Sequence, residues 1–123
     1  MVVFRVVNPS EIQNQLEKLA EYLLSVGISG DQIFESKLVA CELLANVLCH
    51  AKEETGLQGE VKDGFIEMKI LSKTPFELPQ KITCSDIFCE RGRGLFLVKE
   101  LCEGQVFSET GGIKVRIRVK TEE

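Results

Sequence analysis

The segment from Glu35 to Ala51, which reads ESKLVACELLANVLCHA, most constrains the fold of this chain. Its spacing predicts a long helix that is apolar or small on nearly every side, and such a helix lies in a protein core. Three polar residues interrupt it, Glu42, Asn46 and His50, and their intervals of four place them on one stripe. A carboxylate is costly to bury without partners. The stripe therefore either faces solvent, as on an ordinary amphipathic helix, or lines a cavity for a polar ligand or metal.

A strand and an amphipathic helix are predicted before this central helix. Residues 2–7 are rich in β-branched side chains, which favour a strand. Pro9 suits a helix start, and Ser10 with Glu11 supplies capping groups. Apolar residues then recur at helical spacing over residues 12–24, so this helix covers the core with one face.

The boundaries of the central helix are predicted from glycines and charged residues. Gly27 is placed to end the preceding helix, and Asp31 can cap the central one. The helical pattern weakens in the charged residues 52–54, and the central helix is expected to end at Gly56.

Beyond Gly56 the apolar residues alternate, which predicts strands. Asp63-Gly64 between two alternating runs is a hairpin signal, and Thr110-Gly111-Gly112 marks a second hairpin. In the last strand apolar residues alternate with lysine and arginine, so one face packs on the core and the other is basic and solvated. The predicted strands are residues 57–61, 65–71, 105–108 and 113–119. Between the hairpins, residues 72–80 are predicted to form a loop, and residues 81–90 fit either a short helix or a loop.

A glycine-rich loop, Arg91-Gly92-Arg93-Gly94, leads into an apolar helix over residues 95–102 that ends at Gly104. Glycines let backbone N–H groups approach a ligand closely, and a helix start favours an anion. The two arginines add positive charge. Taken alone, the loop fits a phosphate-binding turn or a tight turn with two exposed arginines.

The element order is strand, helix, helix, hairpin, helix, hairpin. It predicts a single domain over residues 1–123, an α/β two-layer sandwich with a mainly antiparallel mixed sheet and helices on one face. The chain has 123 residues, and 44% of them are hydrophobic, which allows one core of useful size.

Composition argues against several classes of protein. The net charge is −4 and no long basic tract occurs, which argues against a non-specific nucleic-acid binder. No apolar run reaches the roughly 20 residues of a membrane span, and no signal peptide is visible. Five cysteines without a CxxC pair suit reduced thiols in the cytoplasm. A zinc site that uses Cys49 or His50 with Cys84 and Cys89 is an open alternative.

Two motifs together, ELLANVLCHA at residues 42–51 and RGRGLFLVKEL at residues 91–101, closely resemble the histidine-kinase-like ATPase superfamily. The nearest branch is the small bacterial serine kinases that act as anti-sigma factors or switch kinases. The resemblance covers essentially the whole chain and implies a Bergerat-type ATP-binding fold. It also implies that Glu42 is the general base toward a partner's serine hydroxyl and that Asn46 ligates Mg²⁺ between nucleotide phosphates. A carboxylate and an amide oxygen one turn apart suit both tasks.

The resemblance assigns the rest of the ATP site to the glycine-rich loop. Gly92 and Gly94 correspond to glycines whose backbone amides hold phosphates, and Arg91 and Arg93 flank them and steady phosphate charge. Leu95, which follows the glycines, completes the nucleotide-binding set. The implied cofactors are ATP and Mg²⁺.

One family motif, Asp-x-Gly-x-Gly, has no counterpart in this chain. Ser72 stands where the adenine-binding aspartate is expected, and Thr74 stands at the first glycine, before Pro75. Losing a charge-assisted hydrogen bond costs about 1.5–3 kcal/mol, or roughly ten- to a hundredfold in affinity.

Three functions are therefore considered. The first is an ATP-dependent anti-sigma-like serine/threonine kinase or switch regulator, which would phosphorylate a small antagonist protein and regulate transcription. The second is a degenerate, non-catalytic member that acts as a protein-binding regulatory module with weak or no nucleotide binding. The third is an unrelated α/β protein. By resemblance, the partners are an antagonist, a sigma factor or both, and the chain pairs as a homodimer through its sheet and first helix.

Overall fold

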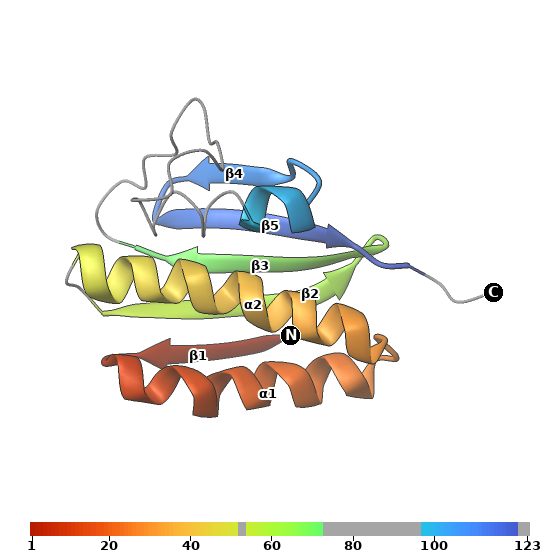
Figure 1. The fold of residues 1–123 in the computed structure, drawn as a ribbon, viewed down its shortest axis with the longest axis horizontal. Helices are drawn as coiled ribbons and strands as arrows, with labels where there is room; N and C mark the ends of the chain where they lie inside the picture. Colours follow the sequence, from red (N-terminus) through yellow and green to blue (C-terminus); the bar gives the residue numbers. More distant parts are fainter. Residues whose placement is uncertain (52–53, 73–96, 121–123) are drawn as a thin grey trace.

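The computed structural model describes residues 1–51, 54–72 and 97–120 of the chain (Figure 1). The predicted loop over residues 72–80 beyond Ser72, the ambiguous segment 81–90 and the glycine-rich loop lie outside these residues. The elements are β1 (Val2–Val6), α1 (Ile12–Ser25), α2 (Gly30–Ala45), β2 (Thr55–Lys62), β3 (Phe65–Leu71), β4 (Val106–Glu109) and β5 (Gly112–Arg118). A 3₁₀ turn, Pro9–Glu11, precedes α1, and a π-helical segment, Asn46–Ala51, continues α2. Residues 97–101 are helical. The predicted order of elements is confirmed.

The five strands form one sheet in the order β1-β2-β3-β5-β4. Each neighbouring pair is antiparallel. The prediction of a mainly antiparallel sheet is therefore confirmed, and its mixed component is wrong for the described strands. Two helices connect β1 to β2, one running back along the sheet and the other forward, so the chain re-enters the sheet opposite to β1 (Figure 1). A single crossover helix would have produced a parallel pair.

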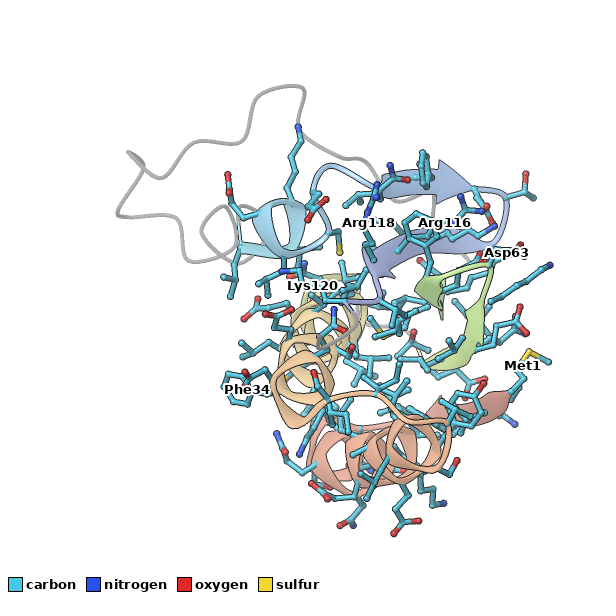
Figure 2. The ribbon with its side chains drawn as sticks, turned by 90° about the vertical axis from the view of Figure 1, so that its right-hand side faces the viewer. Met1, Phe34, Asp63, Arg116, Arg118 and Lys120 are labelled. Atoms are coloured by element: carbon cyan, nitrogen blue, oxygen red, sulfur yellow. The ribbon has the colours of Figure 1, made fainter. Side chains whose placement is uncertain are left out.

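The helices pack on one face of the sheet, as predicted, and the core lies between the two layers (Figure 2). The buried residues of α1 recur at helical spacing and those of β3 at every second position. The largest fully buried side chains include Leu16, Leu19, Leu23, Leu43, Leu44, Leu57, Ile66, Met68, Ile70 and Ile113. Among the helices of the described residues, none has the length and apolar composition of a membrane span.

Both helix starts differ from the prediction by one or two residues. Asn8, not Ser10, caps the first helical turn: it has extended backbone and its side chain accepts a hydrogen bond from the Ser10 N–H at 3.1 Å. Glu11 completes a capping box by accepting from the Asn8 N–H at 3.1 Å. At α2, Ser29 rather than Asp31 is the cap, and its hydroxyl accepts from the Gln32 N–H at 3.3 Å.

Gly56 lies inside β2 and does not stop the central helix as predicted. A Cβ atom on Gly56 would lie 2.9 Å from the carbonyl oxygen of Phe4 in β1. The glycine is therefore explained by close approach of a neighbouring strand. Such an approach depends on tertiary structure and has no local sequence signal.

The two predicted hairpins are confirmed. Asp63 and Gly64 both have positive φ, 54° and 80°, which is the geometry of a type I′ turn. Thr110 and Gly111 form the second turn, and Gly112 already belongs to β5. Along β5 the residues alternate between buried and solvent-accessible, which confirms one core face and one basic face.

Gln32 fixes the start of α2 to the end of β5. Its side chain is 3% exposed, donates to the Arg118 carbonyl oxygen at 2.7 Å and accepts from the Lys120 N–H at 2.9 Å. Gln32→Leu should lower the free energy of unfolding by about 1–3 kcal/mol, because it leaves two backbone groups without partners. Urea denaturation measures this, with Gln13→Leu on the exposed face of α1 as control. Equal stability of the two variants would contradict the assigned role.

Candidate functional site

The C-terminal end of α2 lies over the end of β3, where the chain leaves the sheet (Figure 1). The helix begins at the Arg118 end of β5, to which Gln32 binds it. It has 16 residues, about 24 Å at 1.5 Å per residue. β3 has 7 residues, about 23 Å, and is antiparallel to β5 with Leu71 opposite Gly112. The helix therefore spans the sheet and places Asn46 at the end of β3 where Leu71 lies.

Asn46 is the residue at this end that most needs a partner. It is 5% exposed, and its Nδ2 atom is buried without a hydrogen-bond partner in the described part of the chain. A buried donor without a partner costs about 1–3 kcal/mol. Such a group requires an explanation, and an absent ligand is one.

The helix changes its geometry at Asn46. The Asn46 N–H bonds to the carbonyl oxygens of both Glu42 and Leu43, and π-helical structure then runs from Asn46 to Ala51. π-Helical turns inside helices occur frequently at functional sites. The predicted one-turn spacing from Glu42 to Asn46 is confirmed, because the Asn46 N–H bonds to the Glu42 carbonyl oxygen. The side chain of His50, the third member of the stripe, lies outside the described structure.

Glu42 is half-buried one turn before Asn46, and within the described ranges its carboxylate forms no ion pair. The Glu42 charge affects the pKa of the neighbouring residue Cys41. Burial raises the pKa of the Cys41 thiol, and the negative charge of Glu42 raises it further. A carboxylate that carries no salt bridge and lies next to a buried amide is available to a metal or to a proton.

Thr55 and Ser72 are two further buried polar residues at this end of the sheet. The Thr55 hydroxyl donates to the Leu71 carbonyl oxygen at 2.6 Å, and the Ser72 N–H donates to the Gly111 carbonyl oxygen at 2.9 Å. Ser72 was considered in the sequence as the substitute for an aspartate. Thr55 was missed, because a threonine after a charged helix end carries no signal of burial.

The other predicted binding residues, Arg91, Gly92, Arg93, Gly94 and Leu95, lie outside the described residues. The helical residues 97–101 follow them. Val98 and Cys102 are buried in the same core as α2, and burial raises the pKa of the Cys102 thiol to about 12. The second motif therefore ends in a helix whose buried side belongs to the core beneath α2.

Residues 1–51, 54–72 and 97–120 hold no group of three or more His, Cys, Asp or Glu able to bind a metal. Mg²⁺ with a nucleotide needs only one or two protein oxygens, and Glu42 and Asn46 supply a carboxylate and an amide. Cys84 and Cys89 of the alternative zinc site lie outside the described residues.

Comparison with known proteins gives no assignment: no protein-family model and no curated protein matches the chain.

Proposed function

We propose that this protein is an ATP- and Mg²⁺-dependent regulator of the anti-sigma serine kinase type, with a Bergerat-type fold. The single observation that carries the proposal is the buried Asn46 side chain, whose Nδ2 donor lacks a partner in the described structure and which lies where α2 turns into a π-helix. Glu42, one turn away, supports it as a half-buried carboxylate without an ion pair there. The predicted element order, the open face of the sheet and the helical turn after the glycine-rich loop are consistent with it.

In this proposal the Asn46 Nδ2 would donate to a nucleotide phosphate oxygen, its amide oxygen would hold Mg²⁺, and residues 91–95 would hold the phosphates. Mg²⁺ held there would neutralise charge on the phosphate oxygens. Glu42 accepts the proton of a serine hydroxyl on a small antagonist protein. The serine oxygen then bonds to the γ-phosphorus as the bond to the ADP oxygen breaks, so the products are phosphoserine and ADP.

The second candidate is a protein-binding regulatory module without catalysis. Ser72 favours it, because a buried hydroxyl stands where adenine recognition would use a carboxylate. In either case we propose a cytoplasmic protein with a protein partner, a sigma factor or its antagonist. We also propose a homodimer, to which the exposed apolar side chains of Met1, Val3 and Val7 along β1 would contribute.

Titration calorimetry with ATP and ADP, each with and without Mg²⁺, separates the two candidates. Mg²⁺-dependent binding of both nucleotides supports the kinase-type site. Heat indistinguishable from dilution for both would reject it and leave the binding module.

Glu42→Gln tests the catalytic role. The variant keeps the shape of the side chain, so ATP affinity should change less than about threefold, whereas phosphoryl transfer should fall about a hundredfold or more. Transfer of labelled γ-phosphate to candidate antagonist proteins measures the rate. Glu35→Gln, on the same helix, is the control. Transfer by Glu42→Gln at the wild-type rate would exclude Glu42 as the base.

A further inference from the structure

The sheet face opposite the helices carries more positive than negative charge. Strand alternation directs five cations and three carboxylates of β2–β5 outward: Lys62, Lys69, Lys114, Arg116 and Arg118, against Glu60, Glu67 and Glu109. The chain as a whole carries −4. This face of β2–β5 is therefore net positive, whereas the rest of the chain is net negative.

Most of the charge in the middle of this face is neutralised internally. Glu67 lies 3.3 Å from the Lys114 Nζ and 3.4 Å from the Arg116 Nε. Glu109 lies 3.6 Å from both Lys69 and Lys114. These side chains are partly screened and already paired, so they contribute little to an external partner.

Two cations at one end of the face are not neutralised. Lys62 and Arg118 flank Phe65 in a single row across β2, β3 and β5. Both are exposed, and neither forms an ion pair within the described residues. Asp63, in the adjoining turn, is also exposed and pairs with neither in the described structure.

Aromatic rings hold the two arginines of β5 in place. The Arg118 guanidinium lies 5.7 Å from the centroid of Phe65, and the Arg116 guanidinium lies 5.8 Å from Phe65 and 5.9 Å from Phe107. Figure 2 shows both arginines on β5, between β4 and the β2–β3 turn. A guanidinium stacked on a ring still presents its N–H edge outward, where it can bind a carboxylate with two hydrogen bonds. Phe107, 42% exposed, adds apolar surface beside them.

We infer that Lys62, Phe65, Phe107 and Arg118, with the paired Arg116 packed between the two rings, form a docking surface for an acidic segment of a partner protein that carries apolar side chains among its carboxylates. Charge complementarity selects this occupant. An open depression of about 290 Å³ adjoins the surface at Lys62 and offers room for a side chain; three lysines and three glutamates are among the residues that line it. The surface lies on the face away from α2, so the inference does not depend on nucleotide binding.

Two other occupants fit less well. A second copy that docked through the same face would bring Lys62 and Arg118 against their own counterparts, which like-charge repulsion opposes. A nucleic acid would stack its bases on aromatic rings, but the guanidinium groups already cover Phe65. The carboxylates of Glu60, Glu67 and Glu109 would also repel a phosphate backbone.

Fluorescence anisotropy with a short labelled peptide, in which Asp and Glu alternate with Leu, tests the surface. The peptide should bind saturably at low salt, and its affinity should fall severalfold between about 50 and 300 mM NaCl. Arg118→Glu and Lys62→Glu should each lower the affinity about tenfold or more. Lys18→Glu makes the same charge change on the exposed face of α1 and should change the peptide affinity less than about twofold. Circular dichroism checks that each variant is folded, and the two substitutions report independently.

Four results would overturn the inference. The first is equal loss of affinity in Lys18→Glu and Arg118→Glu, since that would reflect net charge alone. The second is equal binding of a peptide with Asn and Gln in place of the acids. The third is stronger competition by single-stranded DNA than by the unlabelled acidic peptide. The fourth is concentration-dependent self-association that Arg118→Glu abolishes, because a second copy would then occupy the surface.

Discussion

Asn46→Ala is expected to stabilise the nucleotide-free protein and to remove its stabilisation by Mg²⁺ and ATP. The wild-type amide is 5% exposed, and its Nδ2 has no partner among the described residues. Alanine removes that unsatisfied donor and has a higher helix propensity, so the free energy of unfolding should rise by about 1 kcal/mol. If Asn46 served packing alone, its truncation to alanine would instead lower the free energy of unfolding.

Asn46→Ala should reduce the stabilisation by Mg²⁺ and ATP by more than it raises the stability of the nucleotide-free protein. A ligand at about a hundred times its Kd stabilises the folded state by about 2.7 kcal/mol. If Asn46 holds Mg²⁺ and its loss lowers affinity about a hundredfold, the same concentration stabilises the variant by only about 0.4 kcal/mol. Urea denaturation of wild type and variant, with and without Mg²⁺ and ATP, measures both effects.

Ser36→Ala is the matched control for this experiment. Ser36 is also buried on α2, but its hydroxyl donates to the Gln32 carbonyl oxygen at 2.8 Å. Removing a satisfied group should destabilise the protein by about 1 kcal/mol and leave ligand stabilisation intact. If Asn46→Ala behaves like Ser36→Ala in both respects, Asn46 is a structural residue and the proposed site loses its main support.

Elements set by neighbouring residues were predictable from the sequence. The hairpin turn at Asp63-Gly64 requires two residues with positive φ, and Asp-Gly adopts that conformation readily. The buried positions of β3 follow from strict alternation of apolar residues. These features were correct because the chemistry that decides them lies within a few residues.

Features that depend on distant residues were wrong or missed. Asn8 and Ser10 are both good caps, and only the extended backbone at Asn8 decides between them. Gly56 has the composition of a helix terminator, but the Phe4 carbonyl oxygen of another strand explains it. The π-helical geometry at Asn46 has no local signal, because it changes the hydrogen-bond pattern without changing residue type.

The candidate site also combines one feature that neighbouring residues set with others that depend on packing. The interval between Glu42 and Asn46 places both on one stripe of the helix, as expected, and this was readable from the sequence. That Asn46 is buried without a partner in the described structure was not readable, since burial depends on how α2 packs over β2 and β3. Thr55 joins the site only because β2 starts beside the end of β3.

Gly112→Ala is expected to be the most destabilising single-methyl substitution at the glycines of this sheet. A Cβ atom there would lie 2.0 Å from the Ile70 carbonyl oxygen and 3.2 Å from the Leu71 Cα. Both atoms belong to the backbone of β3, so no side-chain rotation relieves the contact. Gly112 pairs with Leu71 on one side and Glu109 on the other, so a shift disturbs two ladders. The free energy of unfolding should fall by about 3 kcal/mol or more.

Gly30→Ala is the control, because it adds the same methyl group at the first residue of α2, where no atom lies within 4 Å. It should change stability by less than about 1 kcal/mol, toward stabilisation if at all. Both are measured by urea denaturation. The close approach of β3 to Gly112 also bears on the candidate site, because the neighbouring Gly111 carbonyl oxygen accepts the Ser72 N–H at 2.9 Å. Gly112→Ala with wild-type stability would mean that β5 lies farther from β3 at this end, and the position assigned to Ser72 at the candidate site would then be wrong.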